Sequence, residues 1–213
     1  MSRAKATTPV PARESKKAAQ SEVTRGMIME AAEKMFAKDG VEGVSLRQIR
    51  VAIGSAHTNV VTYHFGSKEA LIRAIITDRQ AVLERRRAEL LAAARKRGLG
   101  EDLATLAHAV WYPLFELTNT EGRHPYAAFQ VGVDWGKRRI EMRFPVEHEL
   151  GALIAAQLPK EARNFFEERI AISYKMIAGA LEYCDDLYAG NPIKSKRLFE
   201  IAIRMGAAAL ATP

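Results

Sequence analysis

The sequence is poor in thiols, with Cys184 as the single cysteine among its 213 residues. One cysteine excludes an intramolecular disulfide and any metal site built from several thiolates. The histidines do not compensate, because none of the five falls at the spacing with which two ligands on one helix grip a metal: His57, His64, His108, His124 and His148. We therefore expect neither a metal nor a cofactor, and a reducing, cytoplasmic setting fits the chain.

Long apolar runs are also missing. No stretch of about 18 consecutive apolar residues occurs, and the amino-terminal segment lacks the apolar core of a signal peptide. Residues 1–20 are instead polar, proline-containing and basic, without apolar periodicity, which predicts a disordered basic arm. We expect a protein that is neither exported nor membrane-spanning.

Patterns typical of β-sheets and of enzymes are absent as well. The sequence has no sustained alternation of β-branched and polar residues, and helix formers dominate its composition, so we expect an all-α fold. It contains no Gly-x-Ser-x-Gly elbow, no P-loop, no dinucleotide-binding glycine cluster and no His-Glu-x-x-His. No catalytic residue is predicted, and an enzyme in the C-terminal half is the least favoured alternative.

Charge is unevenly spread along the chain. Residues 1–100 carry 19 basic and 10 acidic side chains, whereas residues 101–213 carry 13 and 15. A clustered excess of positive charge attracts a polyanion, and a merely basic, soluble protein is the alternative explanation. The asymmetry indicates a nucleic-acid-binding part followed by a part with another role.

A helix-turn-helix pattern is present between residues 44 and 67. Ser45 and Gln48 have the spacing of a capping box, in which each side chain satisfies a backbone N–H at the start of a helix. A short helix is therefore predicted at residues 46–53, and Gly54 supplies the turn that ends it. A second short helix follows, and two helices joined in this way lay the second one into a DNA major groove.

Longer helices flank this pattern. Thr24 can cap a scaffold helix whose apolar stripe ends at Gly40. Ser67 can cap another helix that runs without Gly or Pro until Gly98. Such a helix would be on the order of 45 Å long and would connect the DNA end of the molecule with the rest.

Residues 24–71 resemble the DNA-binding domain of the tetracycline-repressor (TetR) family of transcriptional regulators. The resemblance rests on the helix that ends at Gly40, the helix capped by Ser45 and above all the run Tyr63-His64-Phe65-Gly66-Ser67-Lys68-Glu69-Ala70-Leu71. The glycine of the turn, Gly54, falls one position earlier than is usual in the family. The family layout implies a DNA-binding domain at residues 21–68, joined by the long helix to an all-helical ligand-binding and dimerisation domain at residues 69–213.

The resemblance also assigns roles at the DNA end. It places the reading helix at about residues 57–64, with Asn59 as the best candidate for base readout, since Asn can form two hydrogen bonds to adenine. Base or phosphate contacts are expected from nine residues: Ser45, Arg47, His57, Thr58, Asn59, Thr62, Tyr63, His64 and Lys68. Packing between helices is an alternative role for Tyr63 and His64. A symmetric dimer is expected to present two such reading helices to a palindromic operator in double-stranded DNA.

The second half of the chain is predicted to consist of helices separated at four prolines: Pro113, Pro125, Pro145 and Pro159. Two longer helices, at about residues 160–188 and 195–211, close the chain, and each has an apolar face at three- and four-residue steps. We expect these faces to form the homodimer contact as a four-helix bundle. They could also bury neighbours within one chain.

An unknown small-molecule effector is implied by the resemblance. Such a molecule would bind the second half of the chain and weaken DNA binding through the long helix. The candidate lining is mostly aromatic: His108, Trp111, Tyr112, Phe115, Phe129 and Trp135. The same residues could equally form a solid core. The sequence thus predicts a DNA-binding transcriptional regulator, a repressor by family habit, and the main alternative is an effector-independent, DNA-organising protein.

Overall fold

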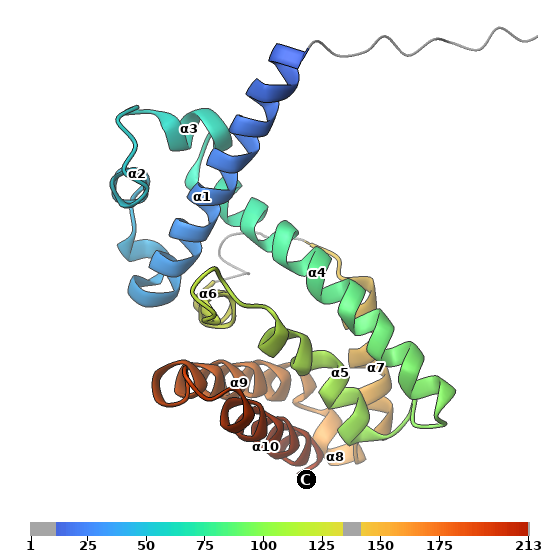
Figure 1. Cartoon of the computed structure of the whole chain (residues 1–213). Helices are drawn as coiled ribbons and strands as arrows, with labels where there is room; N and C mark the ends of the chain where they lie inside the picture. Colours follow the sequence, from blue (N-terminus) through green and yellow to red (C-terminus); the bar gives the residue numbers. More distant parts are fainter. Residues whose placement is uncertain (1–11, 134–141, 213) are drawn as a thin grey trace, which may run out of the picture.

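The structure is a computed structural model that describes residues 12–133 and 142–212. In these ranges the regular elements are ten helices and no strand, which confirms the predicted all-α fold (Figure 1). They are α1 (Ala12–Gly43), α2 (Leu46–Ala52), α3 (Val60–Phe65), α4 (Lys68–Lys96), α5 (Leu103–Glu116), α6 (Pro125–Gly132), α7 (Pro145–Gln157), α8 (Lys160–Arg163), α9 (Phe166–Leu187) and α10 (Pro192–Ala211). None of these described helices is both long and apolar enough to cross a membrane.

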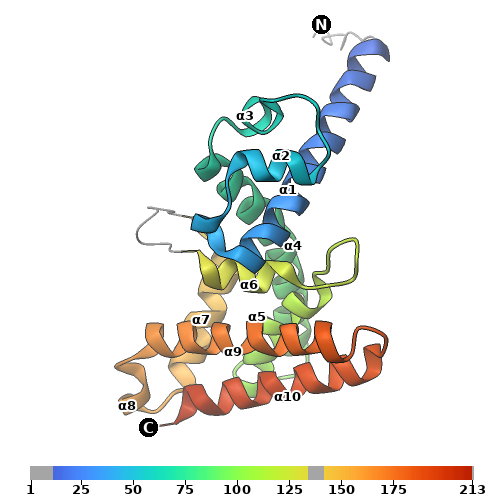
Figure 2. The ribbon, with the colours of Figure 1, turned by 90° about the vertical axis from the view of Figure 1, so that its left-hand side faces the viewer.

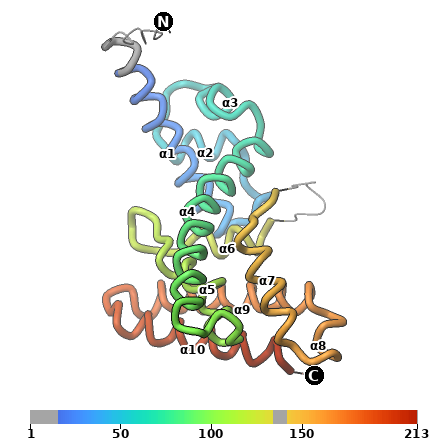
Figure 3. Tube along the Cα trace, turned by 90° about the vertical axis from the view of Figure 1, so that its right-hand side faces the viewer, coloured from blue at the N-terminus to red at the C-terminus, as the bar shows by residue number. Residues whose placement is uncertain are grey.

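The helices form two bodies that α4 connects. α1, α2 and α3 lie together at one end, and α4 leads from them along α5 and α7 of the second body (Figures 1 and 3). α9 and α10 pack along each other at the opposite end (Figure 2). α6 lies between the two ends, where it contacts both α1 and α9.

Helix starts follow the predicted caps. The capping box of α2 is complete, because the Ser45 N–H donates to Gln48 Oε1 at 2.7 Å and the Gln48 N–H donates to Ser45 Oγ at 3.3 Å. Ser67 Oγ accepts the Ala70 N–H at 3.1 Å and starts α4, which runs without a break to Lys96. These two predictions from local sequence are confirmed.

The start of α1 differs from the prediction. α1 begins at Ala12, so residues 12–20 of the predicted disordered arm are helical, while residues 1–11 lie outside the described range. Thr24 is not a cap but an interior residue whose hydroxyl donates to the Gln20 carbonyl at 3.0 Å. Ala and Lys after the last proline of the segment favour helix, which explains the earlier start. The helical dihedrals are interrupted at Gly40, with φ at 73°, close to the predicted end.

Prolines mark three of the four predicted separations. Pro125 and Pro145 are the first residues of α6 and α7, where a missing N–H breaks no helical hydrogen bond, and Pro159 precedes α8. The prediction for Pro113 was wrong, because this residue lies inside α5, which continues to Glu116. Pro113 is buried together with most of the α5 residues around it, and this packing outweighs the hydrogen bond that the proline removes.

The closing helices also depart from the predicted boundaries. The first is divided into the short α8 and the longer α9, which begins at Phe166. At the turn between α7 and α9, the guanidinium of Arg163 donates to two carbonyl oxygens at the end of α7, at 2.9 and 3.0 Å. The second closing helix starts earlier than predicted, at Pro192, where Asn191 caps it.

One hydrophobic core runs through both bodies. Ile28, Phe36 and Ile49 are fully buried at the DNA end, and α4 contributes a series of buried aliphatic residues that two buried polar residues interrupt. The ring of Phe36 in α1 stacks on that of Phe129 in α6, with centroids 5.8 Å apart. The first body therefore shares packed side chains with the second.

Candidate nucleic-acid interface and effector site

The helix that follows the turn begins later than predicted. α3 starts at Val60, so His57, Thr58 and Asn59 precede it rather than forming its first turn. The Val60 N–H donates to the His57 carbonyl at 3.2 Å, and the His57 N–H donates to Ser55 Oγ at 3.2 Å. These two hydrogen bonds hold the segment before α3 in a turn.

α3 has one buried and one exposed face. Val60, Val61 and Phe65 are buried, so Thr62 and Tyr63 face solvent, and Tyr63 is 78% exposed. A hollow of about 530 Å³ beside this face brings five of the predicted residues together with Thr24 and Val60: His57, Thr58, Asn59, Tyr63 and His64.

Arg25 is a residue at this site that the sequence did not single out. Its Nη1 donates to the His64 carbonyl at 3.0 Å, and its guanidinium carbon lies 4.3 Å from the centroid of the Phe65 ring. Arg25 thus holds the C-terminal end of α3 against α1. His64 itself is half-buried, with its ring edge-on to that of Tyr63 at 5.2 Å. The sequence does not predict this contact, because Arg25 and His64 are 39 residues apart and only folding brings them together.

The remaining predicted residues lie around α3 and differ in their exposure and in the contacts that they already make. Ser45 is exposed but engaged in the capping box of α2, and Arg47 is exposed beside it. Lys68 is half-buried, with Nζ 5.9 Å from the centroid of the Phe36 ring. Arg50, which was not predicted, donates to the Ser55 carbonyl at 3.0 Å and fixes the turn between α2 and α3.

Residues 28–75 match the family model described as "Bacterial regulatory proteins, tetR family". The match begins in α1, includes α2 and α3 and ends in α4. The chain carries a tetR-family DNA-binding domain. It is therefore a DNA-binding transcriptional regulator. A comparison with curated proteins finds no match.

In the second body of this TetR-type regulator, the predicted aromatic residues are packed. Trp111 and Phe129 are fully buried, and Phe129 stacks on Phe36 as described. His108 stacks on Tyr112, with centroids 4.4 Å apart. Trp135 lies outside the described residues.

Phe115 is half-buried in a further stack of rings. Its centroid lies 5.4 Å from that of His124 and 5.3 Å from that of Phe199 in α10. This stack joins α5 to α10 and to the start of α6. Its rings therefore help to build the core between these helices.

A cavity lies elsewhere, between α5, α7 and α9. Its volume is about 310 Å³, and none of the five described candidate residues lines it. Its lining is mainly aliphatic and aromatic, with four titratable side chains of α7 and α9. The lining residues are Val110, Glu147, His148, Gly151, Ala152, Ile154, Ala155, Phe166, Glu167, Ile170 and Tyr174. This cavity was not predicted, because only the packing of α5 against α7 and α9 forms its wall.

A buried polar cluster adjoins this cavity. Arg87 of α4 is 0% exposed, and its Nη1 donates to Glu147 Oε2 at 2.9 Å and to Gln80 Oε1 at 3.1 Å. Its Nε donates to the Val110 carbonyl at 3.2 Å, and its Nη2 donates to the Tyr174 hydroxyl at 3.2 Å. The Tyr174 hydroxyl in turn donates to Glu147.

Electrostatics fix the protonation states of two members of this cluster, Arg87 and Tyr174. Burial raises the pKa of the Tyr174 hydroxyl well above its usual value, and the neighbouring Glu147 carboxylate raises it further. Burial opposes the charge of Arg87, but the negative charge of the Glu147 and Glu84 carboxylates outweighs that effect and raises its pKa. Arg87 is therefore a permanent buried cation, and Tyr174 remains a neutral hydroxyl.

Glu84 and Arg87 together tie α4 to α7. The Glu84 carboxylate accepts the N–H groups of Val146 and Glu147, at 2.7 and 2.9 Å, at the start of α7. A carboxylate in this position also opposes the positive end of the helix dipole. The helix that leaves the DNA-binding domain thus holds one wall of the cavity.

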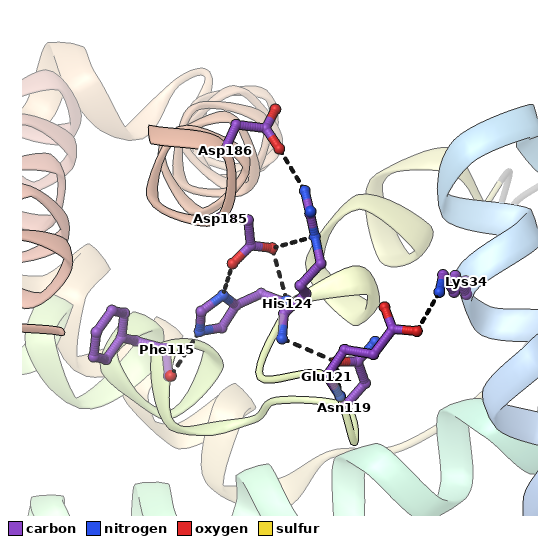
Figure 4. Close-up of polar contacts among 8 residues, drawn as sticks. Lys34, Phe115, Asn119, Glu121, His124, Asp185 and Asp186 are labelled. Carbon is purple, nitrogen blue, oxygen red and sulfur yellow. Dashed lines mark hydrogen bonds and ion pairs between the residues drawn. The ribbon is translucent and has the colours of Figure 1, made fainter. Parts of the chain in front are cut away.

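A second connection between the two bodies runs through the segment between α5 and α6 (Figure 4). Lys34 of α1 donates to Glu121 at 2.5 Å, and the Thr120 N–H donates to Glu30 of α1 at 3.1 Å. The hydrogen bond from the Thr120 hydroxyl is the main cause of the lowered pKa of Glu30. This segment therefore contacts the scaffold helix of the DNA-binding domain directly.

Proposed function

We propose that the protein is a homodimeric repressor that binds a palindromic operator and leaves it when a small molecule occupies the second body. The observation that carries the DNA part is the exposed polar face of α3, presented by a helix whose other face is buried. The DNA-binding domain would span residues 21–68, with residues 69–213 as the ligand-binding and dimerisation domain. Such a protein works where the chromosome is, in the cytoplasm, and we assign it no catalytic activity.

Base readout is proposed for Asn59, whose exposed amide could pair with adenine in the major groove. His57, Thr58, Thr62 and His64 would add base or phosphate contacts around it. Positioning on the phosphates is proposed for the remaining four: Ser45, Arg47, Tyr63 and Lys68. The exposed hydroxyl of Tyr63 supports this assignment, and Lys68 would have to swing away from Phe36 to reach a phosphate.

Dimerisation is proposed through α9 and α10. Six large apolar side chains are exposed on these two helices: Ile172, Tyr183, Leu187, Ile193, Ile201 and Met205. Exposed apolar patches of this kind favour a protein partner. A second copy would cover them and form a four-helix bundle, which would also fix the distance between the two α3 helices.

Selection of bound sequences from a random pool of DNA duplexes tests the proposal. We expect an enriched palindrome whose half-sites lie about one helical turn apart, or a multiple of it. Recovery of all sequences alike would contradict operator binding and support a DNA-organising protein. Repeating the selection with candidate metabolites should identify an effector as a compound that lowers recovery.

A further inference from the structure

The cavity between α5, α7 and α9 has a mainly apolar wall with two acidic residues in its lining. Val110, Ile154 and Ile170 supply aliphatic surface, and Phe166 supplies an aromatic ring. The titratable side chains in the lining are Glu147, His148, Glu167 and Tyr174, and no Lys or Arg is among the described lining residues. Such a wall accommodates an apolar body that carries one polar group.

The favoured charge of that polar group depends on whether a ligand in the cavity can contact Arg87 or Glu147. Arg87 is fully buried behind the wall, whereas Glu147 retains 22% of its side-chain exposure and lines the cavity. A molecule in the cavity therefore meets the carboxylate and not the guanidinium. An anion there would face Glu147 and Glu167, with no Lys or Arg among the described lining residues to compensate it, and desolvation would make that costly.

Arg87 can give up Glu147 without becoming an unpaired buried charge. It would still donate to the Val110 carbonyl, to Gln80 Oε1 and to the Tyr174 hydroxyl, and it lies 3.5 Å from the Glu84 carboxylate. Glu147 by contrast has Arg87 and Tyr174 as its side-chain partners in the described contacts. A new cation beside Glu147 would thus compete mainly with Arg87.

We propose that this cavity takes a small primary amine with an apolar body, and that the ammonium group competes with Arg87 for Glu147. The inference rests on the proposed release by an effector and names the effector's chemical class. Its ammonium group lies against Glu147, and its apolar body lies against Ile154, Phe166 and Ile170. Because Arg87 belongs to α4, loss of its pair with Glu147 loosens the hold of α4 on α7 and changes how α4 carries the DNA-binding domain.

Three probes of similar shape test the charge preference on the full chain: 2-phenylethylamine, 2-phenylethanol and phenylacetate. By titration calorimetry we expect the amine to bind at least about tenfold more tightly than either of the others, a difference of about 1.4 kcal/mol. Equal affinity for the three, tighter binding of phenylacetate, or no binding of the amine would each overturn the proposal.

Three variants test whether the amine binds in this cavity. Glu167→Gln, at an exposed position of the lining, is expected to weaken amine binding several-fold without affecting folding, and Glu147→Gln should abolish the preference for the amine. Glu149→Gln is the matched control, because Glu149 is on α7 but pairs with Arg95 outside the lining. Amine affinity unchanged in Glu167→Gln and Glu147→Gln would overturn the assignment.

Operator binding separates this inference from the proposed function. In wild type the amine should lower operator affinity, and in Glu147→Gln it should not. If the protein selects no operator but still prefers the amine, the proposed function fails and the ligand assignment stands. If the amine binds as expected but leaves operator affinity unchanged, the competition with Arg87 is overturned.

Discussion

His124 and Asp185 form a two-point contact between the start of α6 and the end of α9. His124 Nδ1 lies 2.6 Å from Asp185 Oδ1, and the His124 backbone N–H donates to Asp185 Oδ2 at 2.8 Å (Figure 4). The other ring nitrogen, Nε2, lies 2.9 Å from the Phe115 carbonyl oxygen at the end of α5. One histidine therefore joins three helices of the second body.

Asp185→Asn should destabilise the protein by about 1 to 3 kcal/mol, because it leaves a buried ring nitrogen and a backbone N–H with a poorer acceptor. Asp186→Asn is the matched control, since Asp186 is exposed and contacts the exposed Arg123. Its effect should remain within about 0.5 kcal/mol. Urea unfolding of the two variants measures the difference, and equal effects would contradict the role of Asp185.

Asn59→Ala and Lys68→Gln should weaken operator binding in different ways. Loss of the Asn59 amide should cost about 1 to 3 kcal/mol and relax the preference at one base pair, because it removes base readout. Loss of the Lys68 charge should weaken binding to all sequences and reduce the slope of log affinity against log salt by about 1. Fluorescence anisotropy with operator variants over a salt series separates the two effects.

Each of these DNA-binding variants is the control for the other. A change of salt slope in Asn59→Ala would indicate that Asn59 acts on the phosphates. An unchanged slope in Lys68→Gln would indicate that Lys68 stays against the Phe36 ring in the complex, as it does in the structure.

Local signals in the sequence were sufficient for the parts of the fold that depend on neighbours along the chain. The capping box of Ser45 and Gln48 and the cap at Ser67 determine where α2 and α4 begin, and both were predicted. Pro113 shows the limit of such signals, because a buried helix with strong packing tolerates a proline that would break an exposed one.

The two candidate sites also differ in whether their residues are neighbours along the chain. His57, Thr58, Asn59 and Tyr63 are close together in the chain, so their shared surface could be predicted from one motif. Arg87, Glu147 and Tyr174 are 60 and 27 residues apart in sequence, and only the packing of α4, α7 and α9 brings them together. A charged residue in a helix is usually solvated, so sequence alone gave no reason to bury Arg87.

Met205→Glu should weaken the proposed dimer. Met205 is 58% exposed in a single chain, and a partner that covers it would have to bury the new carboxylate, at a cost of about 2 kcal/mol or more. We expect a shift from dimer to monomer by sedimentation at micromolar concentration, with a parallel loss of operator affinity. Ala92→Glu on the exposed side of α4 is the control and should leave the dimer intact. A dimer unaffected by Met205→Glu would place the contact elsewhere.

His108 should make the protein less stable as the solution becomes acidic. Burial lowers the pKa of His108, and the carboxylates of Glu200 and Glu116 offset this decrease only in part. Because the folded pKa lies below the unfolded value of about 6.5, the unfolded chain binds the proton more readily, and stability falls as the pH drops through that value. His108→Gln should therefore lose less free energy of unfolding than wild type between about pH 7.5 and 5.5. Equal losses would contradict this role.

Cys184 should be almost inert to alkylation in the folded protein. The residue is 1% exposed, its thiol donates to the Ser195 carbonyl at 3.4 Å, and burial together with the nearby Asp185 raises its pKa to about 11. At pH 8 such a thiol is about one part in a thousand thiolate, whereas an unfolded cysteine with a pKa near 8.5 is about one quarter thiolate.

Alkylation by iodoacetamide should therefore be at least about a hundredfold slower in native protein than in urea. Because Cys184 faces α10 of the same chain, any residual reaction reports local separation of α9 from α10, which the proposed dimer contact on these helices would slow further. A native rate close to the rate in urea would contradict the burial of Cys184 within a single chain.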